Sequence, residues 1–127
     1  MSQSVDGNVK TFVASAAIAK HARVVLASDG TISEAGLAQK EIGTALDRAA
    51  AAGASVAVKL RTGAGTHKMI AKEALAIGAT LYTKAGGKVQ DTAESTAFQV
   101  GTALEAATAE NDIIEVLYGA HGDTAVS

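Results

Sequence analysis

The chain has 127 residues and a formal net charge of −2 at pH 7, with 11 basic and 13 acidic residues. It contains no cysteine, which excludes disulfides and thiolate metal sites, and no basic cluster of the kind that neutralises nucleic-acid phosphates. No apolar run approaches the ~20 residues of a membrane-spanning helix. We therefore expect a soluble protein made in a cytoplasm, without a nucleic-acid or membrane partner.

Small side chains dominate the apolar content. Hydrophobic residues make up 48% of the chain, but the aromatic residues are only two Phe and two Tyr, with no Trp. Such side chains bury little area each, and burial contributes only about 25 cal/mol per Å². We expect one domain with a thin core, which favours association with further copies or with a larger body.

The first elements are a polar arm and a strand. Residues 1–8 are small and polar and are predicted to form a flexible N-terminal arm. Residues 9–14 alternate between two faces, which indicates a strand at a sheet edge. His21 follows a short turn at a position where the left-handed region is expected, because histidine tolerates positive φ.

Two hairpin signals follow at matching positions. Asp29-Gly30 follows a strand at residues 24–27 and favours a type I′ turn, which requires positive φ. Gly86-Gly87 separates strands at residues 81–83 and 88–90 in the same way. The residues expected to determine turns are His21, Asp29, Gly30, Gly78, Gly86 and Gly87.

The rest of the chain predicts two more strands, a helix and a tail. Residues 41–46 and 56–60 read as paired strands, and residues 61–66 as a connection. Residues 67–77 place Met69, Ile70 and Ile77 near one stripe, which predicts a short helix that ends at Gly78. Residues 119–127 are predicted to form a C-terminal tail.

These elements occur twice. Residues 42–60 (IGTALDRAAAAGASVAVKL) align without a gap on residues 100–118 (VGTALEAATAENDIIEVLY), and the similarity continues upstream. We therefore predict a mainly β fold: a single domain over residues 9–118, built as a barrel or sandwich from repeat one (17–60) and repeat two (74–118). One repeat alone would leave its apolar face exposed.

No residue pattern predicts chemistry. His21, His67 and His121 are far apart in sequence and lack partners at metal-ligand spacing. Asp47 and Glu105 occupy equivalent positions, which turn chemistry explains as well as a carboxylate pair would. We predict no catalytic, cofactor or metal site, although subunits could still assemble one from these groups.

The order of motifs resembles a phage family, the small capsid decoration (cement) proteins. The resemblance rests on Ala79-Thr80-Leu81-Tyr82, Gly86-Gly87-Lys88-Val89, residues 100–107 (VGTALEAA) and Ile114-Glu115-Val116, with first-copy matches at Val24-Val25, Asp29-Gly30 and residues 42–49. His21 departs from the glycine usual there. The resemblance implies a non-enzymatic β-rich homo-oligomer, a trimer in preference, without a cofactor.

The resemblance also implies a place in the virion. Such a protein, made in the host cytoplasm, sits on the capsid exterior and bridges major capsid protein subunits. Residues 1–14 could add a strand to an exposed sheet edge, so the expected capsid or subunit contacts are Val5, Val9, Thr11, Phe12 and Val13. The alternative is a receptor- or glycan-binding module of a virion, although such modules usually present more aromatic side chains.

Overall fold

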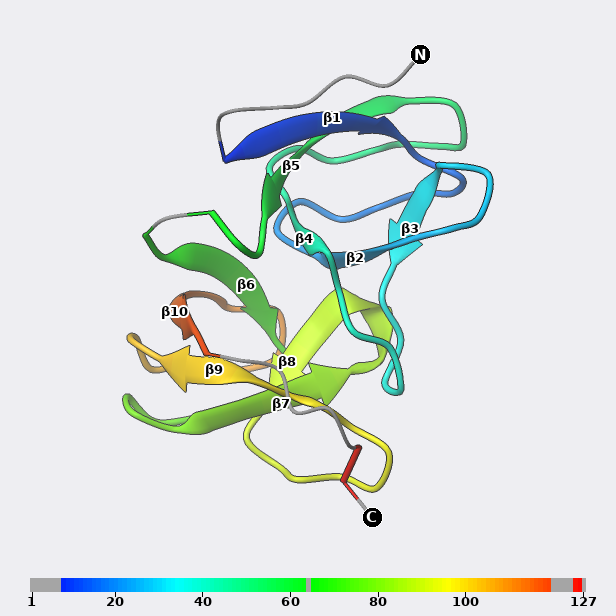
Figure 1. Cartoon of the computed structure of the whole chain (residues 1–127). Helices are drawn as coiled ribbons and strands as arrows, with labels where there is room; N and C mark the ends of the chain where they lie inside the picture. The colour runs from blue at the N-terminus through cyan, green and yellow to red at the C-terminus, as the bar shows by residue number, and fades with distance from the viewer. Residues whose placement is uncertain (1–7, 64, 120–124, 127) are drawn as a thin grey trace.

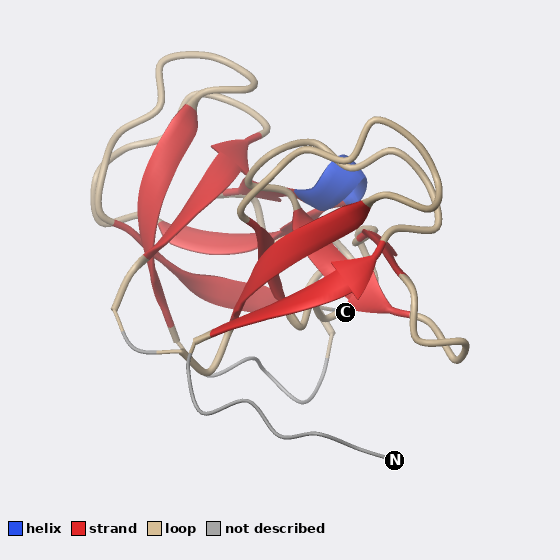
Figure 2. Ribbon diagram, turned by 90° about the horizontal axis from the view of Figure 1, so that it is seen from above, coloured by secondary structure: helices blue, strands red, loops and turns tan. Residues whose placement is uncertain are grey.

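The structure, a computed structural model, describes residues 8–63, 65–119 and 125–126. Within these ranges the regular elements are strands, apart from one short 3₁₀ turn (Figure 2). The predicted mainly β fold class is confirmed. The strands form two units that follow one another in the chain and lie one above the other in Figure 1.

The first unit is an antiparallel five-stranded sheet with the order β1-β5-β4-β2-β3. The predicted pairing of the strand near residues 41–46 with the strand at 56–60 is confirmed as the β4–β5 pair. The strands are β1 (Val9–Val13), β2 (Arg23–Leu26), β3 (Ile32–Glu34), β4 (Gly43–Ala45) and β5 (Ser55–Leu60).

The second unit is a closed barrel with the order β10-β6-β8-β7-β9. Its β6 and β8 run parallel, and its other neighbouring strands run antiparallel. The elements are β6 (His67–Ala71), β7 (Thr80–Lys84), the 3₁₀ turn η1 (Ala85–Gly87), β8 (Lys88–Gln90), β9 (Gln99–Ala103) and β10 (Ile113–Tyr118).

The two units have the same strand order when β6 to β10 of the second unit are matched in sequence with β1 to β5 of the first. They differ in how far they close. In the second unit β6 pairs with β8 at Ile70–Lys88 and Ala71–Val89. In the first unit the same closure is a single parallel bridge between Ala14 and Ile32, so most of β1 is a sheet edge.

Matching backbone contacts support this equivalence. His21 N–H donates to the Ala45 carbonyl at 2.8 Å, and Gly78 N–H donates to the Ala103 carbonyl at the same distance. His21 has φ 71° and Gly78 has φ 85°, both in the left-handed region. The bend between the first and second strands of each unit therefore requires a residue that tolerates positive φ.

The first hairpin differs from the predicted type I′ turn. Gly30 has φ 85°, but Asp29 does not have the positive φ that this turn type requires at both central positions. The Asp29 carboxylate Oδ1 instead accepts from Thr31 N–H at 3.0 Å and from Thr31 Oγ1 at 2.7 Å, an Asx-type arrangement. In the second unit Gly86 and Gly87 both have positive φ.

The helix predicted over residues 67–77 is wrong, because residues 67–71 form strand β6. Both faces of β6 are covered: Met69 and Ala71 belong to the core of the second unit, whereas Ile70 joins the core of the first. A strand buried on both faces loses the alternation that identifies it in a sequence. Without that alternation, the spacing of Met69, Ile70 and Ile77 matched the apolar stripe of a helix.

Each unit has a small hydrophobic core of its own. The first is built around Ile18, Val24, Ile32, Val56 and Val58, with several alanines between them. The second contains Met69, Leu81, Val89, Val100, Ile114 and Val116, again with alanines. Since the chain supplies so few large apolar side chains, the contact between the units is a further source of burial.

An ion-pair group lies where the barrel of the second unit closes. Lys72 Nζ and Lys88 Nζ lie 2.7 and 3.0 Å from Glu110 Oε2. These hydrogen bonds and charges lower the pKa of Glu110 from 4.5 to about 2. The equivalent first-unit residues, Ser15, Thr31 and Ala52, carry no charge. The ion-pair group is therefore present only in the unit whose barrel is closed by the β6–β8 pairing.

The Glu110 group predicts a pH dependence. Because the folded pKa of Glu110 lies below its ordinary value of 4.5, the stabilisation is present above pH 4.5 and is lost as the pH falls toward 2. Glu110→Gln should be less stable than the wild type at pH 6, and the difference should shrink over that window. Urea unfolding at pH 6, 4 and 3 measures it, and a constant difference would contradict the assignment.

Candidate functional site

Strand β1 presents an exposed outer face. Val9 and Val13 are 42% and 45% exposed, and Thr11 between them is exposed as well. Phe12 points to the opposite face and packs against the first core, so its ring is not part of this surface. Val5 lies outside the described residues.

Among the described residues, no strand pairs with most of the other side of β1. Asn8 accepts from Leu60 N–H, and Ala14 N–H donates to the Ala54 carbonyl, so the even-numbered residues of β1 face β5. The backbone groups of Val9, Thr11 and Val13 therefore point away from β5. On that side, closure begins only where Ser15 N–H donates to the Ile32 carbonyl.

A buried ion pair joins the two units. Arg23 Nη1 donates to Glu41 Oε1 at 2.9 Å, and both side chains are fully buried. The same guanidinium crosses to the second unit, where Nε donates to the Lys88 carbonyl at 2.9 Å and Nη2 donates to the Lys84 carbonyl at 2.6 Å. Nothing in the sequence singled out Arg23 or Glu41, because their partners are distant along the chain.

Aromatic groups extend this polar contact. The rings of His67 and Tyr118 meet edge to face with centroids 4.6 Å apart. Burial, followed by the charge of Glu41 and a hydrogen bond with it, raises the pKa of the Tyr118 hydroxyl well above 10. His67 Nε2 lies 3.0 Å from the Leu60 carbonyl, and burial lowers the pKa of its imidazole. These groups join the units structurally and present no reactive atom to solvent.

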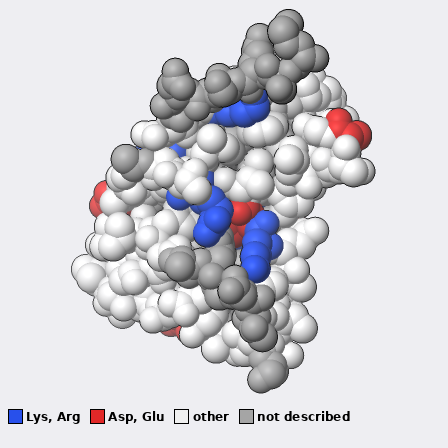
Figure 3. All heavy atoms as spheres, viewed as in Figure 1, with Lys and Arg blue, Asp and Glu red and all other residues white. Residues whose placement is uncertain are grey.

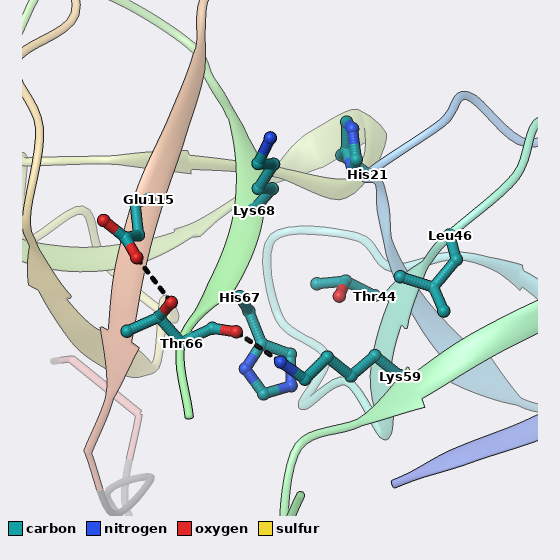
Figure 4. A pocket seen from close by; sticks show the side chains of 8 residues that line it. All are labelled: His21, Thr44, Leu46, Lys59, Thr66, His67, Lys68 and Glu115. Carbon is teal, nitrogen blue, oxygen red and sulfur yellow. Dashed lines mark hydrogen bonds between the residues drawn. The ribbon is translucent and has the colours of Figure 1, made fainter. Parts of the chain in front are cut away.

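A pocket of about 250 Å³ lies beside this contact (Figure 4). Thr66 organises one side of it: its hydroxyl donates to Glu115 Oε2 at 2.6 Å, and its carbonyl accepts from Lys59 Nζ. Burial and then the charges of Lys20 and Lys68 lower the pKa of His21. The residues lining the pocket are His21, Thr44, Leu46, Lys59, Thr66, His67, Lys68 and Glu115.

The pocket does not contain the carboxylates that the sequence singled out. Asp47 and Glu105 are exposed and are absent from its lining, and Glu105 Oε1 accepts from Glu115 N–H at 2.8 Å. His121 lies outside the described residues. No group of three or more metal-ligating side chains occurs within the described ranges.

The surface charge is mixed. On the face drawn in Figure 3, Lys and Arg atoms gather in a small group near the middle, beside acidic atoms, and most of the surrounding surface is uncharged. This differs from the continuous basic surface that binds nucleic-acid phosphates. Among the described residues, no helix is long and apolar enough to cross a membrane.

The expected turn residues lie at bends between strands. His21 and Gly78 occupy equivalent bends, and Gly30 occupies the first hairpin. Gly87 has an additional contact, since a Cβ there would lie 2.8 Å from Ala22 Cβ and 2.9 Å from the Arg23 carbonyl. The second hairpin therefore packs against the first unit, whereas a Cβ on Gly30 would meet nothing within 4 Å.

Comparison with known proteins gives a fold neighbour and a family. The structure is similar to the N base of the head fiber gp8.5 of bacteriophage phi29, with a TM-score of 0.71 and 20% identity, over 87% of this chain and 92% of the other. No curated protein matches the chain. The family model described as phage cement protein matches residues 4–118. The chain therefore belongs to the phage cement protein family, whose members are structural proteins of the phage virion.

Proposed function

We propose that this protein decorates the outside of an icosahedral phage capsid and stabilises it by bridging major capsid protein subunits. Membership of the phage cement protein family supports a place in the virion. The observation that carries the mode of attachment is the open edge of β1, where Val9, Thr11 and Val13 expose both side chains and backbone groups. An exposed edge of this kind can pair with a strand of another protein.

The proposed contact uses β1 as one strand of a shared sheet. Backbone hydrogen bonds along the edge would supply part of the affinity, and Val9 and Val13 would fill shallow apolar positions on the shell. We propose that residues 1–8, of which 1–7 lie outside the described residues, extend the same strand on the shell. Many copies on one lattice would convert modest single contacts into firm attachment.

We also propose that the protein works as a homo-oligomer, with a trimer favoured. The chain buries few large apolar side chains, and some of those it has are exposed, including Ile77 at 70%, Leu117 at 49% and Ile113 at 44%. Association would remove such surface from water. Sedimentation of the free protein and of the protein released from shells would measure the state.

A single proline tests the edge. Thr11→Pro removes an N–H that points away from β5 and leaves the β1–β5 ladder donors in place. Occupancy on expanded empty shells should fall about tenfold, roughly the effect of losing one backbone contact and its neighbours, while the Tm changes little. Leu26→Lys is the matched surface control, because Leu26 is similarly exposed but lies on β2.

The Leu26→Lys control distinguishes a loss of strand pairing at the β1 edge from a general effect of surface substitution on occupancy. If Thr11→Pro occupies shells as the wild type does, β1 is not the attachment strand. If Leu26→Lys lowers occupancy by the same factor, the effect is not specific to the edge. Deleting residues 1–8 in the otherwise wild-type chain separately tests whether the arm contributes.

The alternative of a receptor- or glycan-binding module has less support from the aromatic side chains. Tyr118 packs against His67, and Phe12 packs against the first core. The Phe98 ring lies under Lys40, with Nζ 5.0 Å from the centroid. These rings are engaged within the molecule, whereas sugar-binding surfaces usually leave aromatic faces open to solvent.

A further inference from the structure

We propose that the pocket between the two β units binds a carboxylate side chain of a protein partner, an Asp or Glu on the surface to which this protein attaches. The identification of that partner as the shell protein rests on the proposed function. The pocket is about 250 Å³ in volume and is concave because the outer face of β4–β5 meets that of β6–β10 there. It is separate from the β1 edge and supplies a second kind of contact.

The positive groups at this pocket lack anionic partners. Within the described part of the chain, Lys68 makes no hydrogen bond or ion pair, and Lys59 donates to the Thr66 carbonyl, a neutral acceptor. Figure 4 shows Lys68 and His21 extending toward the same side of the pocket. Burial lowers the pKa of His21, and the charges of Lys20 and Lys68 lower it further, because nearby positive charges disfavour the charged ring.

The acidic lining residue does not neutralise these groups. Glu115 Oε2 accepts from the Thr66 hydroxyl at 2.6 Å. Glu115 and Lys68 are cross-strand neighbours in the β10–β6 pair, yet they form no ion pair within 4.0 Å. In Figure 4 the Glu115 carboxylate points toward Thr66, away from the Lys68 ammonium. An incoming carboxylate would give Lys68 and His21 charge-assisted hydrogen bonds.

The duplicated fold provides an internal comparison. The equivalents of Lys20, His21 and Lys59 in the second unit are Ile77, Gly78 and Leu117. The fold therefore accepts apolar residues and glycine at these positions, and the two lysines and the imidazole of the first unit are not required by its backbone. Of these residues, His21 and Lys59 line the concave site together with Lys68, and this grouping points to recognition of an anion.

The chemistry favours a singly charged carboxylate over a phosphate. The lining carries Glu115 as well as its basic groups, and the whole chain has a net charge of −2. A phosphate dianion would meet more repulsion from both than a single carboxylate would. A contact of this kind adds specificity and speeds association more than it adds affinity.

The test uses the full chain and an acetylated, amidated triglutamate peptide as the probe. On adding the peptide, the pKa of His21, followed by NMR of its imidazole, should rise by about 0.5–1 units, since a carboxylate favours the charged ring. The double variant Lys20→Ile/Lys68→Thr should bind the peptide about tenfold more weakly. Each lysine is replaced by the residue type found at the equivalent position of the other unit, which is Ile77 for Lys20 and Thr11 for Lys68.

A matched control removes two positive charges elsewhere, as Lys10→Gln/Lys40→Gln, and should bind as the wild type does. An unchanged His21 pKa in the wild type, or equal weakening in the control, would overturn the site. Lys68→Thr alone replaces the double variant if the latter does not fold. Shell occupancy separates the two proposals: failure of the wild type to occupy shells refutes the function, whereas full occupancy by the double variant refutes only the pocket's role.

Discussion

Replacing Arg23 with methionine is expected to lower the free energy of unfolding by about 3–5 kcal/mol. The substitution leaves Glu41 fully buried without its guanidinium and removes donors from the Lys84 and Lys88 carbonyls. Total stabilities of small domains are about 5–15 kcal/mol, so this loss could unfold a large share of the protein at 37 °C. Urea unfolding followed by circular dichroism measures it.

The control is the double variant Arg23→Met/Glu41→Leu, which removes the buried charge together with its partner. A buried ion pair replaced by apolar groups of similar volume often costs little, so the double variant should recover most of the stability lost by the single one. A double variant no more stable than Arg23→Met would show that the loss comes from the Lys84 and Lys88 carbonyls, which lose their donor in both variants, and not from the unpaired charge of Glu41.

Alanine at Gly43 or Gly101 is expected to destabilise the protein by about 3 kcal/mol or more. A Cβ would lie 2.2 Å from the Lys59 carbonyl oxygen at position 43 and 2.1 Å from the Leu117 carbonyl oxygen at position 101. Both obstacles are backbone atoms of a paired strand, so relief requires the β4–β5 or β9–β10 pair to separate. These contacts explain physically why both copies have glycine at this position.

Gly119→Ala is the control for these substitutions. Its Cβ would meet only Gly101 Cα, at 3.9 Å, an ordinary contact, so its stability should stay within about 0.5 kcal/mol of the wild type. Thermal unfolding of the three variants gives the comparison. Wild-type stability in Gly43→Ala and Gly101→Ala would show that the paired strands can move apart at little cost.

The hairpins and most strands could be predicted because their signals are local. Alternation identified β1, and Gly30 and Gly87 marked turns whose φ values few other residues adopt. Strand β6 could not be identified in this way, because cores on both sides bury its residues. The repeat could have corrected the error, since β6 is the counterpart of the predicted strand at residues 9–14.

The candidate site was only partly accessible from the sequence. The outward placement of Val9, Thr11 and Val13 follows from alternation, whereas the inward position of Phe12 depends on which face the core covers. The pairing of Arg23 with Glu41 and the pocket at His21 and Lys68 join residues with no regular spacing. Such contacts depend on how two sheets are oriented, which local propensity does not specify.

The sequence by itself determined that the protein is a duplicated, mainly β chain with paired glycine turns, because alternation and positive-φ residues act over a few neighbours. Only the tertiary structure decided which copy closes fully, where the buried arginine crosses between the units and which lysines share a pocket. Those outcomes depend on long-range packing, where burial on both faces and the distances between charges are set by elements far apart in the chain.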